Sequence, residues 1–565
     1  MVGKSIPLSF SSLSLTPLWL FSQFSLQLFH LILNIFAPIM HFTSFTLSVV
    51  FFLVEQDQLS SKFKYFLVFS FIESCFHFVF LYRRHAIDQV NRQIKLPCPN
   101  DKQRARILKG LLSSFESVLE LRACFAGWFY QMDPQSFLPW DGRSGNVDLE
   151  SILYDNAADL LAFTLYSSNL ENLDSSQKVD LDKYIYEFSK ALEYFFPPGR
   201  NPQVRCMKLG LEEFRVEHRP LFFYLAIGLL RLLTGTIYIL VGFRRHVIHT
   251  AVEDFEYWFH PGFKSSSKAL SRHHPIIIIS GVCGLISMPH YAIALLWYSN
   301  RPIFLIGNDC VSLHLLQNCH KLVKIPKSTI ETQVRCKILT LKERSILMKN
   351  MLRRHSFLTE TKKGGGTFII GHSLGTALTS YFAQNYDQCV IGTLLIDPIS
   401  ILPYLPNLVR FFNFNFAARG FVYASPRTPG ELAIRIISHE FGIANYIQRH
   451  FHWFEFANFT SSGSNGTRTS FDKRKTHFVL SEDDAIVCYE KVSKELKRSG
   501  VSMTTLKNTP HGGFLALHLG RMIELTLRLL QELSPIVIEN EPSTRKLNQL
   551  NNLPVVHQIC LNTET

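Results

Sequence analysis

Gly371-His372-Ser373-Leu374-Gly375 is the stretch of this sequence that decides the fold. It has the pattern Gly-x-Ser-x-Gly and lies between an apolar run, Thr367–Ile370, and a helix-forming run, Thr376–Phe382. A strand, a sharp turn and a helix in this order form a nucleophile elbow, whose strained backbone holds a serine hydroxyl at the top of a sheet. Only small residues fit on both sides of such a serine. We therefore predict an elbow at Ser373; the alternative is an ordinary strand-to-helix turn that matches by chance.

A serine nucleophile needs a base to take its proton and a carboxylate to orient that base. Two segments downstream of the elbow supply both. His477–Val487 reads as a strand that ends in an acidic loop, and Asn508–Leu515 places His511 between a short strand and the last helix. This pattern predicts His511 as the general base.

The second half of the chain alternates short apolar runs with helical stretches from about residue 273 onward. Such alternation is typical of a mostly parallel sheet covered by helices on both faces. The expected strands are Pro275–Ile279, Pro302–Ile306, Thr367–Ile370, Ile391–Ile396, His477–Leu480 and Ser502–Leu506.

These features together make residues 270–535 resemble the α/β-hydrolase superfamily. Before the elbow, Pro302–Ile306, Val311–Leu313 and Met351–His355 are similar to the pattern of membrane-associated α/β hydrolases of fungi and other microbial eukaryotes. The resemblance implies an α/β-hydrolase fold, a mostly parallel sheet flanked by helices with a cap insertion. No cofactor and no metal are expected, and the eleven cysteines, an odd number with no Cys-x-x-Cys pair, argue against a zinc site and a disulfide framework.

The resemblance also implies roles for single residues. Ser373 matches the nucleophile, His511 the base and Asp484 the orienting acid, because the family's acid loop reads Gly-x-x-Asp-x-Ile/Val-Val, with a serine here at the glycine position. Asp483 is an alternative acid. Asp397, after the preceding strand, is another, although an Asp-Pro pair at that position more often caps the strand end.

The oxyanion hole is expected to use two backbone amides. One belongs to Leu374, and the other to Val282 in the loop Ser280–Gly284. The family usually has His-Gly where this chain has Ser280-Gly281, so any side-chain role of that histidine is lost while the backbone contribution is kept.

The composition of the chain predicts association with a membrane. Hydrophobic residues make up 47% of the 565 residues and charged residues only 18%, and three long apolar segments stand out: Leu18–Val54, Tyr65–Tyr82 and Pro220–Phe243. The net charge of +13 lies mainly around apolar segments, which favours anionic headgroups over nucleic acid as the partner. Glu73 and Arg231 lie inside two of the segments, where charge is costly unless it is paired or faces protein. Buried helices or interfacial hairpins are the alternatives to membrane spans.

The predicted organisation has five parts. Membrane-associated segments occupy residues 1–88, a mostly helical region 89–219, and a transmembrane or interfacial helix 220–243. The catalytic domain covers 270–535, with a strongly aromatic cap at about 399–475, and a polar tail covers 536–565. Two glycosylation sequons in the cap, Asn458-Phe459-Thr460 and Asn465-Gly466-Thr467, point weakly to a lumenal face.

The function expected from these features is a membrane-associated serine hydrolase that cleaves carboxylic esters, with lipids or other apolar esters as substrates. An acyltransferase with the same triad and an inactive hydrolase-fold scaffold are the alternatives. The expected location is an endomembrane, such as the endoplasmic reticulum or the lipid-droplet surface. The sequence does not specify the oligomeric state, the head group or the acyl chain.

Overall fold

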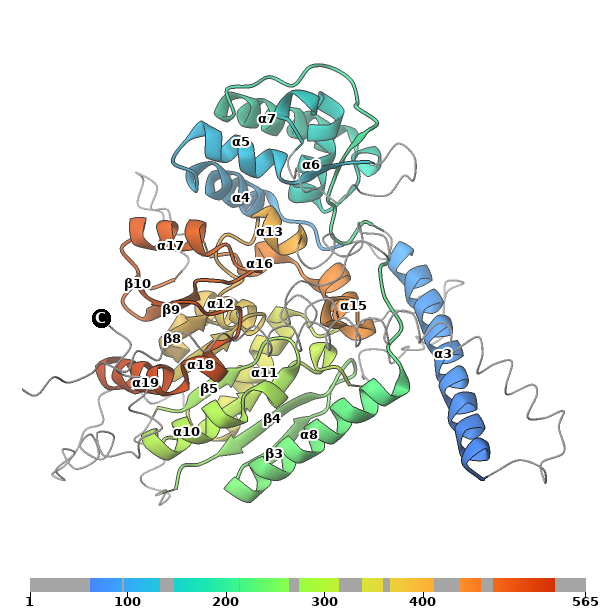
Figure 1. The fold of residues 1–565 in the computed structure, drawn as a ribbon. Helices are drawn as coiled ribbons and strands as arrows, with labels where there is room; N and C mark the ends of the chain where they lie inside the picture. Colours follow the sequence, from blue (N-terminus) through green and yellow to red (C-terminus); the bar gives the residue numbers. More distant parts are fainter. Residues whose placement is uncertain are drawn as a thin grey trace, which may run out of the picture.

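The structure is a computed structural model that describes residues 61–93, 96–132, 147–212, 214–263, 274–314, 338–358, 366–410, 436–458 and 471–533 (Figure 1). The first predicted apolar segment, Leu18–Val54, and the predicted tail, 536–565, lie outside the described residues.

One large sheet organises the second half of the chain. Its eight strands have the order β10-β9-β8-β7-β5-β6-β4-β3. Neighbouring strands are parallel except β4, which is antiparallel to both β3 and β6. The strands are β3 (Arg244–Ile248), β4 (Phe255–His260), β5 (Ile276–Ile279), β6 (Ile303–Ile306), β7 (Thr367–His372), β8 (Val390–Ile396), β9 (Thr476–Ser481) and β10 (Ser502–Leu506).

The central strands are apolar along their whole length because helices cover both faces of the sheet. In β5, Ile277 and Ile279 enter the core on one face, while Ile276 and Ile278 enter the core on the other. The first face is covered by α11 (Leu341–Arg354), α12 (Gly375–Asn385) and α17 (Tyr489–Arg498). The second is covered by α8 (Leu221–Val241), α10 (Pro289–Ser299) and α19 (Leu519–Leu533). The predicted α/β architecture is confirmed.

The large sheet begins before residue 270, the predicted start of the catalytic domain. All six predicted strands are present, but the sheet also contains β3 and β4, which precede residue 270. β3 begins three residues after α8 ends, so the apolar segment 220–243 leads directly into the sheet.

Among the residues that the structure describes, two helices are long and apolar enough to cross a membrane. These are α8 and a 26-residue stretch of α3 (Ser61–Gln93), which contains the predicted segment Tyr65–Tyr82. Both Oε atoms of Glu73, in α3, accept the amide of Leu221 at 2.9 and 3.1 Å, so the carboxylate caps α8. Gly242, at φ 103°, ends α8 in a left-handed turn that a side chain would strain.

The predicted helical region contains α4 (Asp101–Ser113), α5 (Val118–Ala126), α6 (Tyr154–Tyr166), α7 (Ser175–Ala191) and a small pair of strands, β1 (Phe129–Gln131) and β2 (Val204–Cys206). These elements bury a core of their own and lie over the cap (Figure 1). The indole of Trp128 donates to the Tyr404 carbonyl at 2.9 Å, and the Arg410 guanidinium donates to the Gly127 carbonyl at 2.8 Å.

The cap lies between β8 and β9. Its described elements are α13 (Pro406–Val409), α15 (Phe441–His450) and α16 (Trp453–Phe456), whereas the aromatic run 411–416 lies outside the described residues. Asn458 is buried, and its amide donates to Ser380 Oγ at 2.8 Å. This sequon therefore offers no exposed site for a glycan and gives no support for a lumenal face. Asn465 lies outside the described residues.

Candidate active site

The predicted elbow joins β7 to α12. Ser373 has φ 50°, in the left-handed region that a serine seldom occupies. A Cβ atom at Gly371 would collide with Thr379, and one at Gly375 would collide with the carbonyl of Ile279. Both glycines are thus required by close packing of the turn against helix and sheet, which holds Ser373 in its strained conformation.

Three predicted residues from three different loops meet beside this turn. His511 Nε2 lies 2.8 Å from Ser373 Oγ, and His511 Nδ1 lies 2.7 Å from Asp484 Oδ2. Ser373 follows β7, Asp484 follows β9 and His511 follows β10, so all three stand at the carboxyl edge of the parallel strands. The chain order Ser, Asp, His on such a sheet is that of α/β hydrolases. The chain has an α/β-hydrolase fold.

Asp484 is the acid that reaches the histidine. Its second oxygen, Oδ1, accepts the amides of Ile486 and Val487 at 2.8 and 2.9 Å, so the carboxylate is fixed from both sides. The alternative acid Asp483 points to solvent, and its backbone amide binds the Thr509 carbonyl at 3.0 Å.

Asp397, the other alternative acid, is fully buried and binds backbone instead. Its carboxylate accepts the amide of Ser481 at 3.0 Å and that of Gly512 at 2.8 Å. It thereby ties the start of the acid loop to the loop that carries His511. Burial raises the pKa of Asp397, and the nearby Asp484 charge also raises it, while His511 lowers it.

The electrostatics favour a charged imidazole at His511. Burial alone would lower its pKa, but the Asp484 carboxylate, aided by Asp397, outweighs that effect and raises the pKa to about 9. The neighbouring His372 behaves in the opposite way, because burial and the His511 charge lower its pKa to about 3. His372 therefore stays neutral beside the pair.

The two predicted oxyanion donors lie at the same cavity as the serine. Within the ranges that the structure describes, neither the Val282 amide nor the Leu374 amide donates to a protein acceptor. Ser280 is buried, and its hydroxyl lies 3.4 Å from the Ile306 carbonyl, so it faces the sheet rather than the site. The change from histidine to serine leaves the loop backbone in place.

The cavity beside Ser373 is almost wholly apolar. The empty space there, part of which is open to solvent, is about 370 Å³. It is lined by Leu209, Val282, Ser373, Leu374, Ile399, Leu408, Val409, Ile447 and Phe451. The residues around Ser373 thus include two from α13, two from α15 and its end, and one from the helical region.

Asp397, Asp484 and His511 are also the candidates for a metal site among the described residues. Ligand atoms of Asp397, Asp484 and His511 lie within 4.8 Å of one another. Both carboxylates accept two backbone amides each, and both ring nitrogens of His511 have partners. These hydrogen bonds, between Asp484 and His511 and from both carboxylates to backbone amides, account for the cluster without a cation.

Comparisons with known proteins give only distant similarities. No family model and no curated protein matches the chain. Among solved structures, it is similar to a membrane phospholipase A at 13% identity and TM-score 0.33, over 55% of this chain and 93% of that one. It is also similar to the carboxylesterase CesB of Bacillus subtilis, at 12% identity and TM-score 0.32, over 54% of this chain and 98% of that one. The fold assignment therefore rests on the strand order and on the positions of the site residues. The resemblance to fungal enzymes stays a prediction.

Two roles in the site were not predicted from the sequence. Asp397 is a candidate for the acid that orients His511, but its role in tying two loops together depends on partners that lie 84 and 115 residues away. Leu209 belongs to a region in which no site residue was expected, yet it lines the cavity at Ser373. Neither has a local sequence signal.

Proposed function

We propose that this protein is a membrane-associated serine hydrolase that cleaves carboxylic esters of lipids. The observation that carries the proposal is the continuous hydrogen-bonded chain Asp484–His511–Ser373, which ends at a serine in an apolar cavity. A hydroxyl is a weak nucleophile unless a base accepts its proton, and this arrangement supplies that base.

In the first half-reaction, Ser373 Oγ attacks the ester carbonyl carbon while its proton passes to His511 Nε2. The carbonyl oxygen becomes an oxyanion, to which the Leu374 and Val282 amides donate. His511 then returns the proton to the alkoxide oxygen as the carbon–oxygen bond breaks. The alcohol leaves, and the acyl group remains on Ser373. Asp484 stays ionised and stabilises the imidazolium.

In the second half-reaction, water takes the place of the alcohol. His511 accepts a proton from the water as its oxygen attacks the acyl carbon, and the proton then passes to Ser373 Oγ as the acyl bond breaks. The products are a carboxylic acid and free enzyme.

The apolar cavity and the apolar helices support the choice of substrate class. A pocket without polar groups beside the serine fits a hydrocarbon chain, because it offers no hydrogen bonds to a polar acyl group. α3 and α8 expose many large apolar side chains, which supports attachment to the membrane where lipid esters are found.

The proposal is tested with full-length protein in phospholipid vesicles and esters of increasing acyl length. We expect hydrolysis that is lost in Ser373→Ala and kept in Ser176→Ala, a control serine exposed on α7. If both variants keep their activity, Ser373 is not the nucleophile. If the acyl group moved to an added alcohol in preference to water, the protein would be an acyltransferase.

A further inference from the structure

α8 has the composition of a membrane span but is built into the catalytic domain. Its 21 residues form a helix of about 31 Å, which matches the thickness of a hydrocarbon core. Yet it lies in the same layer as α10, against the outer part of the sheet (Figure 1).

Three polar side chains at intervals of seven residues attach α8 to the domain along its length. In the first turn, the Tyr224 hydroxyl donates to Glu440 at 2.9 Å. In the middle, Arg231 lies 3.6 Å from Asp309 and donates to the Ser312 carbonyl at 3.3 Å. In the last turn, the Tyr238 hydroxyl donates to the Leu285 carbonyl at 3.1 Å.

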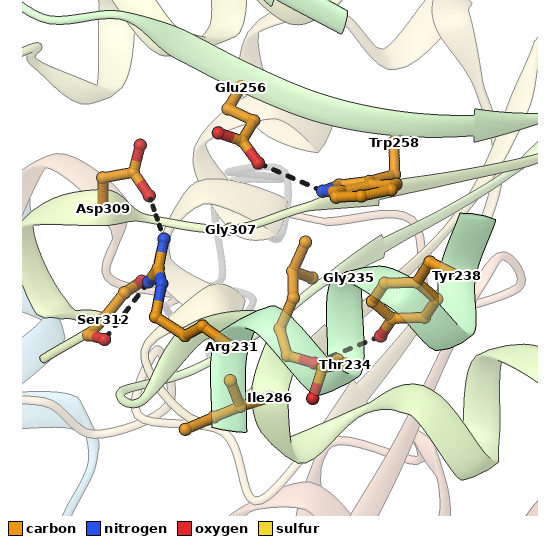
Figure 2. Close-up of a pocket in the computed structure, with 11 residues that line it drawn as sticks. Arg231, Thr234, Gly235, Tyr238, Glu256, Trp258, Ile286, Gly307, Asp309 and Ser312 are labelled. Atoms are coloured by element: carbon orange, nitrogen blue, oxygen red, sulfur yellow. Dashed lines mark hydrogen bonds and ion pairs between the residues drawn. The ribbon is translucent and has the colours of Figure 1, made fainter. Parts of the chain in front are cut away.

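Figure 2 shows this inward face of α8. Arg231, Thr234, Gly235 and Tyr238 line one side of a solvent-open pocket, and residues of β4 and of the loop after β6 line the other. In this pocket the Trp258 indole donates a hydrogen bond to the Glu256 carboxylate at 3.1 Å. A side chain at Gly235 would reach van der Waals contact with that indole.

These contacts are incompatible with a spanning orientation of α8. Arg231 is the central residue of the helix, so in a span it would place its partner Asp309 near the bilayer midplane. Glu256 and the edge strand β3 would enter the hydrocarbon as well. Hydrocarbon tolerates neither an open sheet edge nor such a group of charges, because their polar groups would lose water.

The outward face of α8 carries large apolar side chains. Leu232 is 67% exposed and Leu240 80% exposed. The other exposed members are Phe222, Leu225, Leu229, Leu230, Leu233, Ile237 and Ile239.

Further exposed aromatic side chains lie beyond the end of the helix. Phe263 is 50% exposed and is in ring contact with Trp297 on α10, which is 66% exposed. The buried rings of Phe243 and His260 link Phe263 to Tyr238 on the inward face of α8. Arg244 and Arg245 follow α8 and are exposed. An apolar helix face, an aromatic side chain and basic residues at one end match the acyl boundary and the anionic headgroups of one leaflet.

We infer that α8 lies in the plane of the membrane interface, with its outward face in the acyl region of one leaflet. Both ends of the helix and the catalytic domain then lie on the same side of the membrane. The inference rests on the membrane association in the proposed function, but not on catalysis. It assigns the lipid leaflet as the partner of this surface and gives α8 an in-plane rather than a transmembrane topology.

The test measures depth along the helix. An environment-sensitive fluorescent amino acid replaces Leu225, Leu232 or Leu240 in the full-length chain, in vesicles of phosphatidylcholine and phosphatidylserine. Lipids that carry a spin-label quencher near the headgroup or near the acyl end report depth. Leu119, 73% exposed on α5, is the matched control position.

We expect equal quenching at all three α8 positions, stronger with the shallow quencher than with the deep one, and none at position 119. Deep quenching at 232 with shallow quenching at 225 and 240 would mean a span and overturn the inference. Absence of lipid quenching on α8 would also overturn it, because another protein segment or a second copy would then cover the face. Ser373→Ala should give the same depth profile, so loss of activity and loss of topology are distinguished.

Discussion

Two carboxylates lie close to His511, and their surroundings give them different tasks. Asp484 accepts a hydrogen bond from the imidazole Nδ1, with 2.7 Å between Nδ1 and Oδ2, whereas Asp397 accepts one from the backbone amide of Gly512, which follows the histidine. Asp484 therefore sets the tautomer and charge of the base. Asp397 acts on the base through the loop and is a positioning residue.

Replacing Asp484 by asparagine should lower kcat/KM by about 10⁴-fold at neutral pH, because the amide favours the wrong tautomer of His511. The pKa of His511 should fall as well, because its main charged partner is removed. Steady-state rates on a soluble ester measure both effects. Asp483→Asn is the control and should keep nearly full activity, so a comparable loss there would contradict the assignment of the acid.

The raised pKa of His511 makes activity rise with pH. Only the neutral imidazole accepts the serine proton, so kcat/KM should increase toward a midpoint near 9. The contribution of His511 to the stability of the fold changes with pH in the opposite direction. The protonated, paired histidine stabilises the fold fully below about pH 6.5, the ordinary pKa, and this contribution is lost as pH rises through about 9. A rate profile with its midpoint near 6.5 would contradict the pairing with Asp484.

The triad residues could be predicted from sequence because each lies in a short segment with its own pattern. Gly371–Gly375 marks the turn, and the acid and the histidine follow recognisable strands. Asp397 and Leu209 could not be assigned in this way, since their roles depend on partners distant in sequence.

At the scale of elements, the elbow is fixed by how closely β5, β7 and α12 approach one another. The central strands were predictable because burial on both faces requires uninterrupted apolar runs. β3 and β4 were missed because they lie at the antiparallel edge, where Arg244, Arg245 and Glu256 interrupt the apolar pattern. Hydropathy makes α8 a candidate span, because it counts composition alone and takes no account of the polar inward face of the helix.

Adding one methyl group at Gly375 should disrupt the elbow. The new Cβ in Gly375→Ala would collide with the backbone carbonyl of Ile279, and overpacking of this kind costs about 1–3 kcal/mol. Thermal unfolding and activity should both decline. Gly228→Ala in α8 is the matched control, because nothing lies within 4 Å of its new methyl group. Equal stability of the two variants would contradict the close packing at the elbow.

At the scale of the whole molecule, both halves of the chain form one site. The helical region packs over the cap and contributes Leu209 to the cavity at Ser373, which places it where it can shape substrate access. α8 covers the sheet and carries the surface that we assign to the membrane. The catalytic domain, cap and helical region are therefore expected to act as a unit at the lipid surface.

Enlarging Leu209 should shorten the acyl chain that the site accepts. In Leu209→Phe the larger ring occupies part of the cavity beside Ser373, so rates on long-chain esters should fall about ten-fold relative to those on short-chain esters. Competition between two ester lengths measures the ratio. Leu119→Phe, exposed on α5, should leave the ratio unchanged. An unchanged ratio of long-chain to short-chain rates in Leu209→Phe would mean that the helical region does not select the acyl chain.

The most direct test of the account is covalent labelling of the full-length protein in membranes with a fluorophosphonate, followed by mass spectrometry of the modified peptide. We predict a single phosphonylated residue, Ser373, with labelling abolished in Ser373→Ala and strongly slowed in His511→Ala. Absence of labelling in the wild-type protein, or labelling that persists in Ser373→Ala, would contradict the proposed serine-hydrolase mechanism.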